Sequence, residues 1–397
     1  MGINGVVLRI KDKSLGDVGE ISAFGKTLID WVGGAFGAPF KTIEHSQVID
    51  CCEKLRAAVD RTRPITVVLY CDTPLVTSKT VAAAVKQLRE SGQNMLKLPR
   101  GFVFKTEHLF EVNSLYLEAP VVSDHEFATV SDGEALSRIS DAMRRRILRF
   151  HSSNGVRITD FYNTYIDCDV VLGAGVTIEP YNFIKGKTVI KSGATIMPGN
   201  YIENCIINSG ARIDSSRLYN SVIGERTKVG PFAYIRPDTV IGSDCRIGDY
   251  VELKNCVIGA GCKVSHLSYV GDAELGDECN VGCGVVFANY DGKNKYRSIV
   301  GKRVFIGSNA NIVAPVVIAD RSFIAAGSTI TKAVPEQALA IARARQSVIP
   351  DWQGNMYAPP SAAKTEPRGA FNLVQYDNGI IDASSSGNAD KRGDGDI

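Results

Sequence analysis

Aliphatic residues recur at every sixth position over much of the chain, beginning near residue 172. An α-helix repeats a face every 3.6 residues and a strand every second residue, so neither element alone produces this period. A glycine often follows the aliphatic residue, and a small side chain stands four positions after it. The clearest runs are Leu172, Ile178, Ile184, Ile190, Ile196 and Ile202; Ile223, Val229, Ile235, Ile241, Ile247 and Leu253; and Val300, Ile306, Ile312, Ile318, Ile324 and Ile330.

Six-residue units with two inward positions predict a β-helix. Three units make one triangular coil, and stacked coils pair as parallel strands about 4.8 Å apart, with open edges only at the two ends. We therefore predict an all-β left-handed parallel β-helix of hexapeptide repeats over residues 161–345. Cys245, Cys262 and Cys279 all fall at the small inward position and are evenly spaced along the chain, about one coil apart. We expect them to form a buried apolar ladder rather than a metal or redox site.

The N-terminal part follows a different pattern. Residues 1–132 alternate strand-like and helix-like segments, which predicts an α/β domain. Within it, Ile65–Tyr70 reads as a buried strand and Ser78–Ser91 as a helix. At the other end, residues 346–397 are rich in Gly, Ser, Asp, Ala and Pro, which favours a C-terminal arm and a disordered tail.

A linker over residues 133–160 separates the two predicted domains. Apolar residues at helical spacing predict a helix from Glu134 to Phe150, capped by Ser131 or Asp132. The run Arg144–Arg146 is either a phosphate site or a solvated helix face, and we favour the second.

Charge and cysteine content narrow the class of protein. The 45 basic and 43 acidic residues leave a net charge of +2, which predicts no whole-molecule attraction to nucleic acid or to a membrane surface. The first ten residues do not resemble a secretory leader, and no run of 18 apolar residues occurs. We expect a cytoplasmic protein whose ten cysteines are free thiols.

Two cations are predicted to share one outer face of the β-helix. Arg236 and Lys254 each follow an inward aliphatic residue and are separated by one full coil of the repeat, so they should lie one above the other. Neighbouring cations repel unless an anion lies between them, and such a pair suits a phosphate dianion. Two solvated surface charges are the alternative.

His266 is the candidate general base. Asp249, His266 and Cys283 are evenly spaced, again about one coil apart, and should lie on successive coils. Imidazole titrates near neutral pH, although a lone histidine is more often structural. Residues 289–297 interrupt the six-residue period with a polar insertion, where a cleft could form or where the insertion is neutral. Tyr269, Asn280, Asn289 and Tyr290 fall on nearby coils.

Several motifs between Thr164 and Arg343 resemble the bacterial bifunctional glucosamine-1-phosphate N-acetyltransferase and N-acetylglucosamine-1-phosphate uridyltransferase family. They occur in the order of that family: GPFAYIRP from Gly230, HLSYVGDAE from His266, NYDG from Asn289, GSTITK from Gly327 and ALAIARAR from Ala338. The resemblance implies transfer of an acetyl group from acetyl-CoA to the amine of glucosamine 1-phosphate, in UDP-N-acetylglucosamine biosynthesis.

The same resemblance implies roles for individual residues. His266 would be the general base, oriented by Glu252, and Asn289 would place the acetyl group or polarise its thioester carbonyl. The sugar phosphate would be held by Arg236, Lys254, Tyr269, Asn280 and Tyr290. The CoA site would be lined by Cys283, Ser308, Ala326 and Arg343.

Cys283 and the assembly state complete these expectations. Cys283 departs from the family, which usually has Ala there; it either shifts the fit of the acceptor or fills space, and we favour the second. The family further implies a homotrimer in which a C-terminal segment near Trp352 helps to complete each active site.

The N-terminal domain departs further from the family. Its strand ending at Asp72 resembles a strand that carries a metal-binding aspartate, but the second ligand, normally Asn, aligns with Ser131. The Gly-rich phosphate loop is absent and the domain is about 100 residues shorter than in the family. We therefore predict a reduced, Rossmann-like nucleotidyltransferase domain without uridyltransferase activity.

Three functional hypotheses follow. The first is a monofunctional amino-sugar-phosphate N-acetyltransferase that needs no metal. The second is retained nucleotidyl transfer around Asp72, which would require Mg²⁺. The third is a non-catalytic accessory subunit of a full-length relative. The sequence alone does not distinguish a glucosamine phosphate from a galactosamine phosphate as acceptor.

Overall fold

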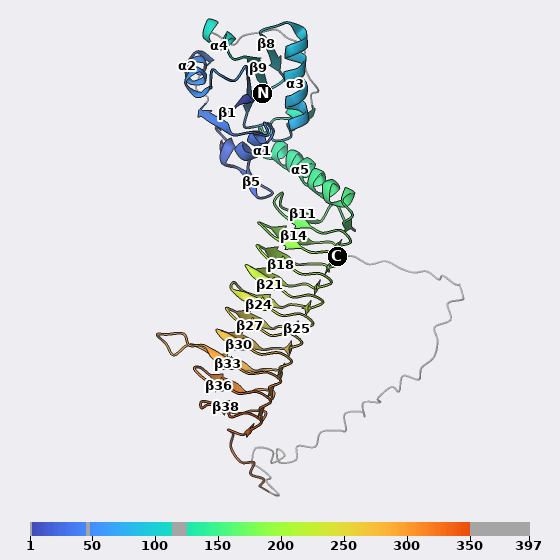
Figure 1. Cartoon of the computed structure of the whole chain (residues 1–397), viewed down its shortest axis with the longest axis vertical. Coiled ribbons are helices and arrows are strands. Elements are labelled where there is room, and N and C mark those ends of the chain that lie inside the picture. Colours follow the sequence, from blue (N-terminus) through green and yellow to red (C-terminus); the bar gives the residue numbers. More distant parts are fainter. Residues whose placement is uncertain (1, 45–47, 113–124, 350–397) are drawn as a thin grey trace, which may run out of the picture. The chain divides into compact units, whose positions relative to one another are not determined.

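The computed structural model describes residues 2–44, 48–112 and 125–349 (Figure 1). Residues 2–344 belong to one compact unit. The described residues beyond it, 345–349, contain no helix or strand. Trp352 and the predicted disordered tail lie outside the described residues.

The N-terminal domain is a five-stranded sheet with helices on both faces. β1 pairs in parallel with β6 and β7, whereas β9 is antiparallel to both β7 and β8. In spatial order the strands are β6 (Phe40–Glu44), β1 (Ile3–Arg9), β7 (Ile65–Tyr70), β9 (Gly101–Lys105) and β8 (Met95–Leu98). The α/β class predicted from the sequence is confirmed, and so is the buried strand at Ile65–Tyr70.

Alternation along the strands supplies two apolar faces, because successive side chains of a strand point to opposite sides. Val7 and Val67 pack on one side with α1 (Leu28–Gly34) and α3 (Ser78–Ser91). Val6 and Val68 pack on the other side with α2 (Val48–Ala58) and α4 (His108–Glu111). The short elements of this domain are β2 (Lys11–Asp12), β3 (Gly16–Asp17), β4 (Ser22–Ala23), β5 (Lys26–Thr27), η1 (Val18–Glu20) and η2 (His125–Phe127).

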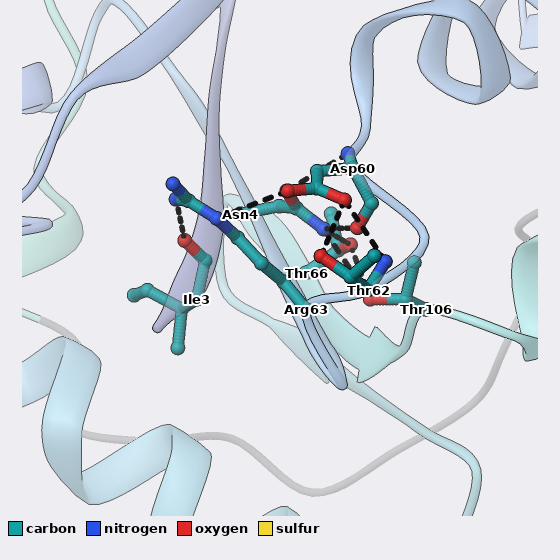
Figure 2. Close-up of polar contacts among 7 residues, drawn as sticks. All are labelled: Ile3, Asn4, Asp60, Thr62, Arg63, Thr66 and Thr106. Carbon is teal, nitrogen blue, oxygen red and sulfur yellow. Dashed lines mark hydrogen bonds and ion pairs between the residues drawn. The ribbon is translucent and has the colours of Figure 1, made fainter. Parts of the chain in front are cut away.

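A buried amide joins the starts of β1 and β7 (Figure 2). The Asn4 side chain donates to the carbonyl oxygen of Asp60 at 2.9 Å and to the Thr66 hydroxyl at 3.2 Å. It accepts the Asp60 N–H at 3.0 Å, and the Thr66 hydroxyl in turn contacts the Thr106 hydroxyl at 3.0 Å. Because a buried amide is costly without partners, this network favours one register of the strands.

The predicted linker helix is α5 (Gly133–Ser153), with Asp132 as its N-cap. Its arginine run agrees only in part with the predicted solvated face. Arg144 is buried and bonds to Asp141 and to the carbonyl oxygen of Tyr162. Arg145 contacts Asp141 at 2.8 Å, and Arg146 donates to a backbone carbonyl oxygen at 2.9 Å. The predicted solvated face is therefore confirmed for Arg145 and Arg146, whose side chains are exposed, and wrong for Arg144, which is buried with protein partners.

The C-terminal part is a parallel β-helix with three sheets (Figure 1). Each coil gives one strand to each sheet, so consecutive strands of a sheet differ by three in number, except β37 and β39 at the C-terminal end. Inward aliphatic residues stack in register, as Ile178 does on Ile196, and form one continuous core. The predicted β-helix is therefore confirmed.

The strands of the β-helix are short. The eleven-stranded sheet holds β10 (Arg157–Ile158), β13 (Thr177–Ile178), β16 (Thr195–Ile196), β19 (Arg212–Ile213), β22 (Lys228–Val229), β25 (Arg246–Asp249), β28 (Lys263–His266), β31 (Asn280–Val281), β34 (Phe305–Ile306), β37 (Phe323–Ile324) and β39 (Leu339–Ala340). The ten-stranded sheet holds β11 (Thr164–Ile166), β14 (Asn182–Lys185), β17 (Tyr201–Glu203), β20 (Arg217–Tyr219), β23 (Tyr234–Ile235), β26 (Glu252–Lys254), β29 (Tyr269–Gly271), β32 (Val286–Ala288), β35 (Asn311–Val313) and β38 (Thr329–Ile330). The nine-stranded sheet holds β12 (Val171–Leu172), β15 (Val189–Ile190), β18 (Ile206–Ile207), β21 (Ser221–Ile223), β24 (Thr239–Ile241), β27 (Val257–Ile258), β30 (Ala273–Leu275), β33 (Ser298–Val300) and β36 (Val317–Ile318).

The cysteine ladder lies inside this core as predicted. Cys245, Cys262 and Cys279 are buried free thiols. Each donates its S–H to a glycine carbonyl oxygen, at 3.0, 3.1 and 3.0 Å respectively. Across the residues with described positions, no helix is long and apolar enough to span a bilayer.

Candidate active site

Arg236 and Lys254 lie on the outer face of the ten-stranded sheet, one coil apart. Ile235 pairs with Leu253 in register, and the Arg236 backbone N–H donates to the Leu253 carbonyl oxygen at 2.8 Å. Since both flanking aliphatic residues point inward, the two cations point outward on the same face. The stacking predicted from their spacing is confirmed.

Each cation already has a carboxylate nearby. The Arg236 guanidinium donates to Glu252 at 2.8 Å, and this contact raises the pKa of Arg236. The Lys254 ammonium lies 3.8 Å from Asp272. The carboxylates offset the mutual repulsion of the cations and leave room for an anion to compete for them.

Lys295 adds a third cation that the sequence reasoning did not select. It belongs to the loop that follows β32. An isolated antiparallel β-bridge between Tyr290 and Lys295 folds this loop back on itself. Lys295, and then burial, lower the pKa of Lys254. The signal available in the sequence was the basic composition of the 289–297 insertion, which has no periodicity from which to place it.

Asp272 is a buried carboxylate that ties the loop to the sheet. It accepts a hydrogen bond from the Asn255 amide at 2.6 Å and another from the Asn289 amide. The same Asn289 amide approaches the Tyr269 hydroxyl at 3.4 Å. Asn289 therefore contacts both Tyr269 and Asp272, a carboxylate that the sequence reasoning missed.

Gly271 provides the space for this convergence. A β-carbon at that position would lie 2.3 Å from the Tyr269 hydroxyl oxygen and 2.9 Å from the Asn289 amide nitrogen. Both distances are shorter than non-bonded atoms tolerate, so any larger residue would displace one of the two polar groups.

His266 stands at the end of β28, three residues before Tyr269. Its Nδ1 lies 2.6 Å from a carboxylate oxygen of Asp249, the residue at the same register position one coil earlier. The imidazole is half-exposed. Glu252, which the resemblance implied as the orienting carboxylate, instead binds Arg236. The reason is register: Glu252 belongs to the neighbouring sheet, whereas Asp249 pairs directly with His266.

The residues assigned to CoA follow one corner of the β-helix. The backbone N–H of Asn309 donates to the Cys283 carbonyl oxygen at 2.8 Å, and that of Gly327 donates to the Ser308 carbonyl oxygen at 2.8 Å. The Arg343 guanidinium donates to the Ala326 carbonyl oxygen at 2.9 Å.

This corner also connects with the backbone of His266. The Gly284 N–H, directly after Cys283, donates to the His266 carbonyl oxygen at 3.4 Å. His266, Cys283, Ser308, Ala326 and Arg343 therefore lie on successive coils, over roughly 19 Å at about 4.8 Å per coil.

Asn280 and Tyr290 are less connected to the cations. Asn280 pairs with Lys263 on the eleven-stranded sheet. Tyr290 is exposed and donates its hydroxyl to the Gly292 carbonyl oxygen at 2.6 Å. Within the described chain, neither shares a hydrogen bond or ion pair with Arg236 or Lys254.

Asp72 does not fit the magnesium ion that its resemblance implies. Three hydrogen bonds join its carboxylate to the Arg100 guanidinium, at 2.8, 3.1 and 3.3 Å. Arg100 also lies over the Tyr70 ring at 4.2 Å, and the Ser131 hydroxyl donates to Asp132 at 2.9 Å. No group of three His, Cys, Asp or Glu residues suited to a metal occurs among the described residues. The Arg100 guanidinium therefore binds Asp72 at the position where the resemblance implies a magnesium ion.

Comparisons with known proteins agree with the sequence motifs. A family model described as the GMPPB C-terminal domain matches residues 217–318. The bifunctional protein GlmU of Clostridium tetani is 52% identical over 245 residues, which is 59% of this chain and 51% of the relative. GlmU of Clostridium acetobutylicum is 46% identical over 244 residues, which is 62% of this chain and 54% of the relative.

One solved structure to which this chain is similar is that of LpxA, a UDP-N-acetylglucosamine acyltransferase from Bacteroides fragilis. The two chains are 17% identical, with a TM-score of 0.28. The match covers 45% of this chain and 69% of the LpxA chain. The chain spans about half the length of the curated relatives it matches. The resemblance identified from the motifs is confirmed: the chain is related to the bifunctional GlmU proteins over somewhat more than half of its length.

Proposed function

We propose that the chain transfers an acetyl group from acetyl-CoA to the amine of glucosamine 1-phosphate. The observation that carries this proposal is the position of His266, whose Nδ1 lies 2.6 Å from Asp249, three residues before Tyr269 and one coil before Cys283. A base between a phosphate-binding surface and an acyl-donor surface suits an amine that must lose a proton before it attacks.

The reaction balances with the residues of this chain. His266 accepts a proton from the sugar ammonium group, and the amine nitrogen then attacks the thioester carbonyl carbon. A C–N bond forms and the C–S bond breaks. CoA leaves as a thiolate, the nitrogen loses its second proton to this thiolate to give the amide and CoA–SH, and His266 returns its proton to solvent. The step itself requires no metal.

The phosphate of the sugar would lie among Arg236, Lys254 and Lys295. Two of these cations are held by Glu252 and Asp272, so a phosphate dianion would compete with one carboxylate that is partly open to water, Glu252, and one that is buried, Asp272. Arginine binds two phosphate oxygens at once, whereas lysine contributes a point charge. Tyr290 and Asn280 would join this site only after the loop or a second chain moves toward them.

Asn289 has a narrower role in this proposal than the resemblance implied. Its amide hydrogens face Asp272 and Tyr269. The group left for substrate is its side-chain oxygen, which accepts hydrogen bonds and does not donate them. We therefore assign Asn289 to holding the sugar amine for attack rather than to stabilising an oxyanion.

The assembly that we propose is a homotrimer, supported by an aliphatic stripe on the nine-stranded sheet. On each strand of this sheet one residue points outward directly before the inward aliphatic residue. On eight strands this outward residue is itself aliphatic, and it stacks on the outward residue of the neighbouring strand. Only Glu274 interrupts the stripe, and it pairs with Arg297 at 2.8 Å. The stripe residues are Val171, Val189, Ile206, Val222, Val240, Val257, Ile299 and Val317.

The part of this stripe from Val171 to Val257 is unbroken over six strands, and an apolar stripe of this length is typical of an interface. We expect sedimentation to give three times the monomer mass of 42.8 kDa. A variant with Val240→Asp and Val257→Asp should sediment as a monomer. A monomeric wild-type protein would refute the homotrimer.

We further propose that uridyltransferase activity has been lost. The charged groups at the carboxyl end of the N-terminal sheet are neutralised within the chain: Arg9 contacts Asp17 and Glu20, and Asp72 is held by Arg100. A nucleotide and Mg²⁺ would have to displace these partners. Release of pyrophosphate from UTP in the presence of Mg²⁺ and N-acetylglucosamine 1-phosphate would favour retained nucleotidyl transfer instead.

The test of the acetyltransferase is direct. The protein is incubated with acetyl-CoA and glucosamine 1-phosphate, and the acetylated sugar is measured by mass spectrometry, because thiol reagents would titrate the ten cysteines. His266→Ala should abolish the product. Lys263→Ala is the matched control, since Lys263 is exposed on the same strand. If neither glucosamine phosphate nor galactosamine phosphate gives an acetylated product, the acetyltransferase proposal fails. The accessory-subunit and nucleotidyl-transfer hypotheses then remain.

A further inference from the structure

The carboxylate that faces His266 has been given no step in the reaction described so far. Asp249 ends β25 and His266 ends β28, and the two residues are partners in the register of the eleven-stranded sheet. The Asp249 Oδ1 lies 2.6 Å from the His266 Nδ1. This distance is slightly shorter than the range of about 2.7–2.9 Å that is typical of charge-assisted N–H···O hydrogen bonds.

The backbone around the pair is built for close approach. A β-carbon at Gly248 would lie 2.0 Å from the carbonyl oxygen of Ser265, so only glycine allows the two strands to approach in this way. The N–H of Leu267, the residue directly after His266, donates to the Asp249 carbonyl oxygen at 3.0 Å. The contact between Asp249 and His266 therefore rests on fixed backbone on both sides and not on two free surface side chains.

The electrostatics fit a carboxylate that accepts a hydrogen bond. The hydrogen bond from His266 lowers the pKa of Asp249, and the positive charge of Arg246 on the same strand lowers it further. Asp249 is therefore ionised at neutral pH and accepts a proton-bearing nitrogen. An imidazole whose Nδ1–H is engaged in this way carries its lone pair on Nε2.

We propose that Asp249 is the positioning residue of the acetyl transfer. It keeps the proton of neutral His266 on Nδ1, so that Nε2 is the atom that accepts the proton of the sugar amine. A carboxylate behind a catalytic imidazole has this effect in the serine proteases, where its amide variant leaves the imidazole in the wrong tautomer. The inference rests on the proposed function and assigns to Asp249 the task that the resemblance gave to Glu252.

The expected effect is moderate because the pair is partly open to water. The side chains of Asp249 and His266 are 37% and 54% exposed. Since a positioned base contributes roughly 10²–10⁴-fold to a rate, we expect Asp249→Asn to lower kcat by about 10- to 100-fold. The KM for each substrate should change less than about twofold, because Asp249 lies behind the base and binds neither substrate.

The experiment combines kinetics with a readout that needs no activity. Nitrogen-15 spectra of histidine-labelled protein at pH 8 report which imidazole nitrogen of His266 carries the proton. The variants are Asp249→Asn, which removes the charge, and Asp249→Glu, which keeps it. Asp244→Asn is the matched control, because Asp244 is an exposed aspartate that pairs with Arg226.

Four outcomes are distinct. A proton that moves from Nδ1 to Nε2 in Asp249→Asn, with a loss of kcat that Asp249→Glu partly restores, supports the proposal. An unchanged tautomer overturns it, even if the rate falls, because the residue would then be only structural. An unchanged kcat in an active enzyme also overturns it. If the wild type transfers no acetyl group but the tautomer changes, the proposed function fails while the Asp249–His266 pairing stands.

Discussion

Removing the Arg100 guanidinium should destabilise the N-terminal domain. The carboxylate of Asp72 is buried, and its side chain is 7% exposed, whereas that of Arg100 is 38% exposed. Breaking a fully buried ion pair by deleting one partner costs about 3–5 kcal/mol. Because water reaches Arg100, we expect about 2 kcal/mol for Arg100→Met, including about 0.5 kcal/mol for the lost contact with the Tyr70 ring.

The assay follows the fluorescence of Trp31 during unfolding in urea, which preserves ion pairs. Trp31 donates its indole N–H to the Ala23 carbonyl oxygen at 2.8 Å and therefore reports on this part of the chain. The other tryptophan, Trp352, is replaced by Phe. With an m-value of about 2 kcal/mol/M, the unfolding midpoint should fall by about 1 M.

Two further variants separate charge from geometry. Asp72→Asn combined with Arg100→Met should recover about half of the loss, since the buried group is then neutral. Arg100→Lys keeps the charge without the planar fork, and it should fall between wild type and Arg100→Met. A midpoint for Arg100→Met within about 0.2 M of wild type would refute this reasoning and would reopen Asp72 as a cation ligand.

Two other predictions concern the candidate active site. Gly271→Ala should lower kcat/KM by about 100-fold, because the added β-carbon displaces Tyr269 or Asn289 by about 1 Å; an unchanged rate would show that their convergence is irrelevant to catalysis. Lys295→Met should raise the KM for the sugar phosphate about tenfold through the loss of one cation. Lys295 lowers the pKa of Lys254, so in wild type the ammonium form of Lys254 is lost at a lower pH than usual and KM rises on the alkaline side. In Lys295→Met this rise should move to higher pH, and KM measured from pH 7 to 10 would contradict the argument if the rise stayed in place.

Much of the fold was predictable because the repeat encodes it. One inward aliphatic residue per six-residue unit assigns each unit to a coil. The same register predicts that Cys245, Cys262 and Cys279 point inward, and the structure places them in the core. Spacings of about one coil predicted that Asp249 lies beside His266 and Arg236 beside Lys254. These parts of the candidate site follow from period and register alone.

The partners of the polar groups were not predictable in the same way. Glu252 and Asp249 both lie within one coil of the residues that they could serve, and register assigns Glu252 to Arg236 and Asp249 to His266. The Arg144–Arg146 run likewise gave no indication that its guanidinium groups have partners within the protein.

The sequence by itself therefore determined the β-helix, the α/β domain and the coils of the candidate residues that lie within the regular repeat. Only the tertiary structure placed Arg100 on Asp72, Asp272 between Asn289 and Asn255, and Lys295 beside Lys254. The physical reason is that inward positions are set by a repeating hydrophobic pattern, whereas polar side chains at the surface and in an aperiodic loop choose among several partners by distance and charge.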